Sequence, residues 1–395
     1  MSSPPTRSRD EADELALSLV RGDALLRVQR AVGLVPRDGL GVGRRALFFA
    51  ALSWLPIAVW ALLAGRAFPG ATAEPLLQHF GVHVRCLVAI PLFILAEGVG
   101  HGLTTRLVPY FLHSGLVAEG ARTRFAEIVR GVARLRDATL PWIAILALVL
   151  AWALLSPAPR ETHEVIWAED GPRLGFGGFW FLYVARPIYL GLLFGWLWRL
   201  VLLTVLFVRL GALGLDVVPT HPDGAGGLGF LERLPTMFSP VVFAVSAVLA
   251  SRFAHDVLHH GVQVQSLRLP MLGFGVLVLV LFLAPLAVWA RPLGAAKRRA
   301  LFEYGTLVGR HGRLVRRRWI LREPVEDDAL LAAPEIGPVA DTLALYEAVR
   351  KLRSIPISRV SLLAIALPAL VPMLPVVAIE IPIRDLLLKI LSTLA

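Results

Sequence analysis

The chain has 395 residues, of which 56% are hydrophobic and only 17% are charged. This composition is too apolar for a soluble domain that buries a single core, so it predicts an all-α, polytopic integral membrane protein. A net charge of +11 would suggest nucleic acid as a partner in a soluble protein, but here the basic residues flank apolar runs. Basic residues beside apolar runs are explained by membrane orientation and by anionic lipid headgroups. We therefore expect the lipid bilayer as the partner and no nucleic acid.

The first 45 residues are polar and rich in arginine. They contain no short apolar run followed by a small-residue cleavage site, so we expect no cleaved signal peptide. We expect residues 1–45 to be a cytoplasmic, amphipathic segment. The single cysteine, Cys86, lies inside an apolar run and belongs to no cysteine metal site.

Seven apolar stretches are long enough to cross a hydrocarbon core of about 30 Å, which requires about 20 helical residues. Two of the seven, residues 79–102 and 174–208, contain charged side chains. The remaining five are bounded by charges and are residues 46–65, 138–156, 234–251, 269–290 and 360–379. Residues 46–290 are therefore expected to hold the first six spans.

The distribution of basic residues predicts the orientation, because cytoplasmic loops accumulate Lys and Arg. With the N-terminus inside, the cytoplasmic segments hold 30 of the 40 basic residues. These segments are residues 1–45, 98–137, 209–233 and 291–359. The C-terminus is then outside, and the scarcity of lysine, a codon bias typical of GC-rich genomes, suggests a bacterial inner membrane. Helical spacing of apolar residues in 98–137 and 291–359 predicts long helices that extend into a helical cytoplasmic layer.

Charged residues inside the spans are costly, by about 2.5 to 3.5 kcal/mol at a helix centre, so each requires an explanation. Arg85 and Arg186 lie in the outer parts of their spans, and Glu380 is available as a partner. They indicate either an electropositive vestibule that attracts anions or local pairing that locks helices together. Glu97 and Arg199 lie near the inner end, where a structural ion pair is the favoured interpretation.

Two pairs of histidines recur at helical spacing near the outer ends of two spans. His79 and His83 form one pair; His255 and His259 form the other, with Asp256 beside them. If the two helix ends meet, imidazoles and a carboxylate would bind Zn²⁺ or respond to protons near pH ~6.5. The spacing has no catalytic glutamate between the histidines, and interfacial histidines bonded to water or backbone are the alternative.

The stretch THPDGAGGLGFLERLP, residues 220–235, belongs to a glycine-rich loop over residues 216–233. A phosphate-binding loop requires a strand before its glycines and a helix directly after them, whereas a membrane span precedes these. We therefore expect a tight bend, in which His221 and Asp223 latch the loop to the basic cytoplasmic helices. Any further role is expected to be gating and not catalysis.

The basic stretch over residues 297–318 is expected to contact anionic lipid headgroups, with a soluble anionic ligand as the alternative. Residues 360–395 comprise the last span and an outer tail that is amphipathic enough to lie along the interface. Pro368, Pro372 and Pro375 interrupt this span, and each lacks a backbone donor. The span is either a pore-lining or gating element or a kinked packing helix.

No nucleophile elbow, HExxH, Walker A or kinase pattern occurs, so an enzyme is not expected. The first hypothesis is an ion channel or transporter, assembled as a homo-oligomer with the seventh span near the conduction path. Arginines outnumber carboxylates inside the membrane, which favours anions as the permeant species. The second hypothesis is a non-conducting membrane sensor or scaffold. Its cytoplasmic helices would dock a partner, and its outer histidines would sense pH or metal.

Overall fold

The computed structural model describes residues 15–36, 39–70, 74–155, 165–170, 173–323 and 337–380. Seven helical stretches in these ranges are long and apolar enough to cross a membrane, which confirms the expected count and the all-α class. The stretches are Val42–Leu63, Phe80–His113, Glu119–Leu155, Phe176–Gly211, Gly229–His260, Val264–Ala287 and Arg359–Ile379. The tail after residue 380 and the acidic segment 324–336 lie outside the described residues.

Several of these stretches are built from more than one element. The α-helices are α2 (Ala24–Ala31), α3 (Val42–Leu63), α4 (Phe80–His83), α5 (Ile90–His113), α6 (Arg122–Asp137), α7 (Leu140–Leu155), α8 (Phe176–Trp180), α9 (Arg186–Gly211), α10 (Ser239–His260), α11 (Val264–Ala287), α12 (Ala290–Val315), α14 (Gly337–Lys351), α15 (Arg359–Leu370) and α16 (Leu374–Glu380). The π-helical segments are η2 (Val84–Ala89), η6 (Phe181–Ala185) and η8 (Arg316–Ile320). The 3₁₀ segments are η1 (Leu76–Gln78), η3 (Glu119–Ala121), η5 (Ile166–Ala168), η7 (Gly229–Phe238) and η9 (Val371–Met373). One antiparallel pair of two-residue strands, β1 (Glu169–Asp170) and β2 (Arg173–Leu174), precedes α8.

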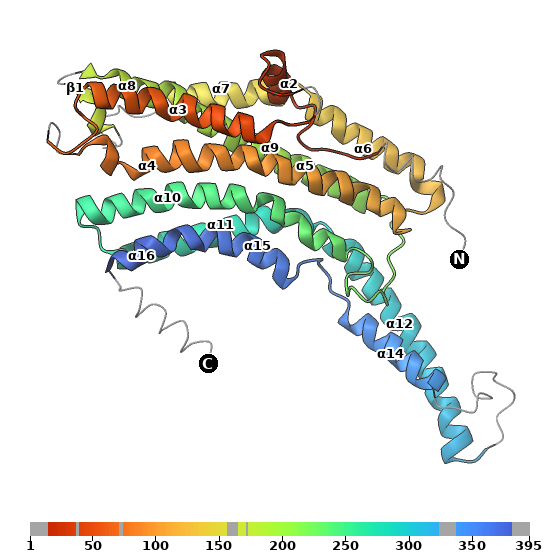
Figure 1. Cartoon of the computed structure of the whole chain (residues 1–395). Helices are drawn as coiled ribbons and strands as arrows, with labels where there is room; N and C mark the ends of the chain where they lie inside the picture. Colours follow the sequence, from red (N-terminus) through yellow and green to blue (C-terminus); the bar gives the residue numbers. More distant parts are fainter. Residues whose placement is uncertain are drawn as a thin grey trace.

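The spanning helices pack as layers (Figure 1). α3, α7 and the α8–α9 stretch lie on one side, α5 runs through the middle, and α10, α11 and α15–α16 form the other side. α12 and α14 pack side by side and project away from this bundle. We call this projecting pair the arm, and the end of the bundle that carries it the arm end. The opposite end, where α4 begins and α10 ends, is called the histidine end.

The core lies where α5, α9, η7, α10 and α11 meet. The indole Nε1 of Trp196 donates to the carbonyl of Phe93 at 2.9 Å, and its ring packs edge-on against Phe238. Phe238 in turn packs against Phe282 of α11 at a centroid distance of 4.9 Å. These buried aromatic contacts tie four spans together along their inner faces.

The sixth span and the arm are not one continuous helix. The helix α11 ends at Ala287, and α12 begins at Ala290. Pro292 has no N–H to offer the carbonyl of Val288, four residues earlier, so the hydrogen-bond ladder is interrupted there. Trp289, at the break, is fully buried between the rings of Phe111 and Phe207. The arm is therefore attached to the core by a packed aromatic side chain.

Candidate functional site

Four charged side chains meet in the interior where α3 begins. Arg199 of α9 donates from Nη2 to Asp23 Oδ2 at 2.8 Å and to Glu97 Oε1 at 2.7 Å. Arg45 of α3 donates from Nη1 to Glu97 Oε2 at 2.5 Å. Each of these four side chains is at most 2% exposed. We call this buried, charge-balanced group the charge network.

The charge network holds the segment 15–31 against the spanning helices. Asp23 is the N-cap of α2, where its Oδ1 accepts from the Leu26 N–H at 2.7 Å, and its other oxygen binds Arg199. Gln29 of the same helix accepts from Arg45 Nε. Two guanidinium nitrogens, Arg45 Nη2 and Arg199 Nε, have no hydrogen-bond partner among the described residues. Each charge nevertheless has an opposite charge at hydrogen-bonding distance.

Glu97 and Arg199 are in direct contact, and a structural ion pair between these two residues was the favoured interpretation of the sequence. Sequence reasoning missed Arg45, Asp23 and Gln29. Arg45 comes directly before the first apolar run, so it was assigned to the cytoplasm. Asp23 stands in the pattern of an N-cap, an acidic residue before a helix, and that signal was available.

Arg85 and Arg186 face aromatic rings on different helices. The guanidinium carbon of Arg85 lies 5.2 Å from the ring centroid of Phe181 and 5.5 Å from that of Tyr189. That of Arg186 lies 6.0 Å from the ring of Trp152 on α7. Both contacts are cation–π interactions that join helices. The side chain of Glu380, the expected partner, lies outside the described residues.

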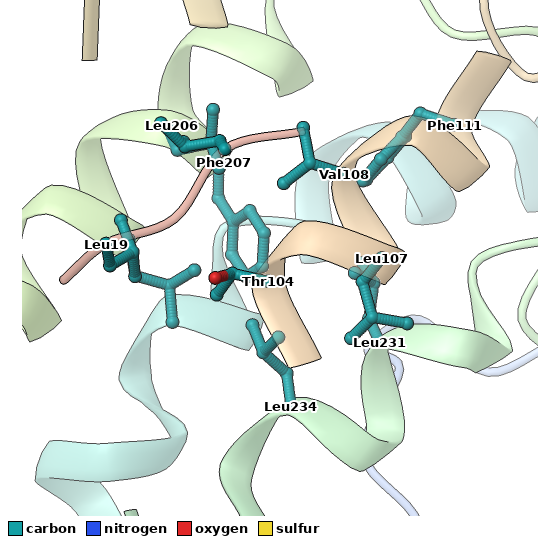
Figure 2. A pocket seen from close by; sticks show the side chains of 11 residues that line it. Leu19, Thr104, Leu107, Val108, Phe111, Leu206, Phe207, Leu231 and Leu234 are labelled. Atoms are coloured by element: carbon teal, nitrogen blue, oxygen red, sulfur yellow. The ribbon is translucent and has the colours of Figure 1, made fainter. Parts of the chain in front are cut away.

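A small cavity lies between the segment 15–31, α5, α9 and η7 (Figure 2). Its lining is apolar, with Leu19, Phe207 and Leu234 facing it from three of these elements. Thr104 is the one hydroxyl in the lining, and it donates back to the Gly100 carbonyl of its own helix at 2.8 Å. The cavity therefore presents no charged group to an ion or polar ligand.

The glycine-rich loop folds around the carboxylate of Asp223. Asp223 Oδ1 accepts from the N–H groups of Ala225 and Gly227 at 2.8 and 3.2 Å, and Oδ2 accepts from Gly229 at 2.8 Å. Backbone N–H groups converging in this way form a site for an anion. Here the chain's own carboxylate fills it, which leaves no such site for a phosphate. Burial disfavours the Asp223 charge, but these N–H groups and His221 outweigh it and hold the pKa of Asp223 below its ordinary value.

The loop is latched to the segment that follows α14 and not to a basic cytoplasmic helix, and Arg353 provides the latch. Its Nη2 donates to the Asp223 carbonyl at 2.8 Å, and its backbone N–H donates to the Gly224 carbonyl at 2.8 Å. Arg353 also pairs with Glu232 of η7. His221 bonds within the loop, with its Nδ1 2.9 Å from Asp223 Oδ1. The bend thus joins η7 to the start of the seventh span.

The seventh span is broken at η9, between α15 and α16. Pro368 cannot donate to the Ala364 carbonyl, and the hydroxyl of Ser239 on α10 donates to it instead, at 2.6 Å. Ser246 of α10 donates in the same way to the Ala369 carbonyl, at 2.6 Å. Hydroxyls on a neighbouring helix commonly satisfy backbone groups freed by proline in a membrane. Pro372 and Pro375 fall in η9 and in the first turn of α16.

Five ionisable residues gather at the histidine end. Glu74, in the loop before η1, has its Oε2 3.3 Å from His79 Nε2 and 3.5 Å from His255 Nε2. Ligand atoms of Glu74, His255 and His260 all lie within 4.8 Å of one another. The rings of His79 and His259 lie 5.0 and 4.6 Å from the His255 ring. The ends of the two spans do meet, as the histidine hypothesis required. We call these five residues the histidine cluster.

Two of the expected histidine-cluster members are not part of the group. His83 binds elsewhere, since its Nδ1 accepts from Trp54 Nε1 at 2.9 Å and its Nε2 lies 3.0 Å from the Leu76 carbonyl. Helical spacing fails here because His79 precedes α4 and has a non-helical backbone. Asp256 likewise does not belong to the group of ligand atoms, and Glu74 supplies the carboxylate. Sequence reasoning missed Glu74, an isolated acid in a loop.

Comparisons of the chain with protein-family models, with curated proteins and with solved structures found no match.

Proposed function

We propose that this integral membrane protein is a non-conducting sensor or scaffold. In this proposal the N-terminus and the arm are cytoplasmic, and the histidine cluster faces the outside of a bacterial inner membrane. The arm docks a partner, and the histidine cluster responds to conditions outside. No catalytic role is proposed.

The observation that carries the proposal is the charge network. An ion path requires polar groups that face water, whereas Glu97 and Arg199 bind each other and are almost completely buried. Arg85 and Arg186 lie against aromatic rings, and serines of α10 bind the carbonyls freed near the prolines. Each of these features supports tight helix packing over conduction.

The arm supports the docking role. α12 and α14 project beyond the bundle (Figure 1), so they reach into the aqueous phase if the spans cross a membrane. Phe302 is 80% exposed and lies among the exposed Arg298, Arg299 and Arg310 on α12. A basic surface with one large aromatic residue suits a protein partner with an acidic surface.

An ion-flux measurement tests the proposal. The purified protein is reconstituted in liposomes, and current is recorded over a range of pH, calcium concentration and voltage. We expect no more current than in protein-free liposomes. A reproducible current would overturn the proposal, because a non-conducting protein carries none in any oligomeric state.

The second candidate is the anion channel or transporter, formed as a homo-oligomer. The observation that favours it is the broken backbone at η9, since transporters commonly bind substrate where membrane helices are discontinuous. The channel hypothesis predicts an anion-selective current in the liposome measurement, and this current should lose its selectivity in the variant Arg186→Gln. A current with unaltered selectivity in this variant would remove Arg186 from the path.

A further inference from the structure

The histidine cluster has the composition of a transition-metal site. It offers one carboxylate and up to four imidazoles, from the loop before η1, the start of α4 and the last turns of α10. Imidazole nitrogen suits zinc, copper, iron and nickel, whereas calcium and magnesium prefer oxygen ligands. The donor set therefore excludes the hard cations and fits Zn²⁺ best among the colourless divalent ions.

Two of the distances between the donor atoms match those of a tetrahedral ion. Zn²⁺ binds nitrogen and oxygen at about 2.0 to 2.2 Å, so tetrahedral ligands stand about 3.3 to 3.6 Å apart. Glu74 Oε2 lies 3.3 Å from His79 Nε2 and 3.5 Å from His255 Nε2. His260 lies within 4.8 Å of Glu74 and His255, and its ring is exposed at the rim. In the proposed site, His260 would supply the fourth ligand.

These short distances are not hydrogen bonds. Both ring nitrogens of His255, Nε2 of His259 and Oε2 of Glu74 are buried and have no hydrogen-bond partner in the described part of the chain. Buried polar atoms are normally paired, because leaving one unpaired costs stability. Buried polar atoms without a partner, beside ligand atoms of Glu74, His255 and His260 that lie within 4.8 Å of one another, suit a bound cation.

We propose that Glu74, His79, His255 and His260 bind one Zn²⁺ ion, with His259 as a supporting residue that packs on the His255 ring. The ion would join the loop before η1 and the start of α4 to the end of α10. Its role as the outside signal rests on the proposed sensor function; binding itself does not. A conducting protein would still bind zinc here, so the two proposals fail independently.

The test is a zinc titration of the full chain, purified with a tag that contains no histidine and placed in lipid nanodiscs. Calorimetry with ZnCl₂ is expected to show saturable binding of one ion per chain. Glu74→Gln, His255→Ala and His260→Ala are each expected to weaken binding by at least about tenfold. His113→Ala, an exposed histidine at the arm end, is the matched control and is expected to bind as the wild type does.

His260→Ala keeps the test decisive if the buried substitutions disturb folding, because His260 is exposed. Its elution in size-exclusion chromatography is expected to match the wild type. Substitution by Co²⁺ adds a second measurement, since a tetrahedral nitrogen and oxygen site gives intense visible absorption that the His260 variant loses. Absence of saturable zinc binding, or equal binding in all three variants and the control, would overturn the proposal.

Discussion

The charge network and the histidine cluster are both groups of ionisable side chains gathered from distant parts of the chain, but their contacts differ. In the charge network, donor and acceptor atoms lie 2.5 to 2.8 Å apart and the charges balance. In the histidine cluster, Glu74 Oε2 lies 3.3 Å from His79 Nε2 and 3.5 Å from His255 Nε2, and each contact is an ion pair only when the imidazole is protonated. The first group is complete within the chain. The second leaves buried polar atoms of Glu74, His255 and His259 without a hydrogen-bond partner among the described residues.

This difference separates a structural role from a binding role in a membrane protein. Composition alone does not distinguish the two roles, because both groups contain costly ionisable residues. The contact distances do distinguish them, since buried charges that are bonded to each other have little capacity left for a ligand. The following experiments test whether the two groups differ as their contacts indicate.

The largest effect is expected from Arg199→Met. The variant leaves Asp23 and Glu97 buried with only Arg45 as a counter-charge, which should destabilise the protein by about 3–5 kcal/mol. Thermal denaturation in detergent measures the change. Arg209→Met, which replaces an exposed residue in the last turn of the same helix, is the control and should have a far smaller effect. Equal effects in the two variants would show that the charge network is not structural.

Zinc should stabilise the wild type by about 2.7 kcal/mol when its free concentration is 100 times the Kd. The rise in melting temperature should be absent in His255→Ala and present in Arg209→Met. This pattern would tie the stabilisation to the histidine cluster and not to general effects of the metal. A rise of equal size in His255→Ala would argue against the assignment.

Asp223→Ala should cost about 1–3 kcal/mol near neutral pH, because it leaves loop N–H groups unpaired. The pKa of Asp223 is lowered in the folded protein, so its contribution is complete above its ordinary pKa of about 3.9 and is lost as the pH falls through the lower, folded value. The melting temperatures of wild type and variant should therefore converge only in strong acid. Asp216→Ala, an exposed neighbour, should show little difference at any pH.

The smallest effect is expected from Ser239→Ala, which removes the donor to the Ala364 carbonyl and should cost about 1 kcal/mol. Adding Pro368→Ala should restore the loss, because an alanine at 368 provides the missing N–H. Ser266→Ala, an exposed serine, is the control for thermal denaturation. Failure of the double variant to recover would mean that the proline does not free this carbonyl.

The number and type of the spans could be predicted because the length and polarity of each run depend only on neighbouring residues. Partners could not. Arg199 binds Asp23 across 176 positions of sequence, and no local pattern specifies which helices will be adjacent. Arg45 was hidden by its place beside the first apolar run, and Glu74 by its isolation in a loop.

Local rules also failed where the backbone is irregular. The i, i+4 spacing placed His79 and His83 on one helical face, but α4 begins only at Phe80. By contrast, the glycine-rich bend was predictable from its turn residues. That the Asp223 carboxylate fills the centre of the bend was not predictable. Sequence reasoning was therefore strongest for regular helices and weakest at their ends, where Asp23, Arg45 and the histidine cluster lie.

The charge network also constrains how the protein is made. Synthesis proceeds from the N-terminus, so Asp23, Arg45 and Glu97 emerge long before Arg199. Until α9 is inserted, these three residues carry a net charge of −1, and Asp23 has no arginine to bind. The contact between Asp23 and Arg199 can therefore form only after the fourth span has been synthesised.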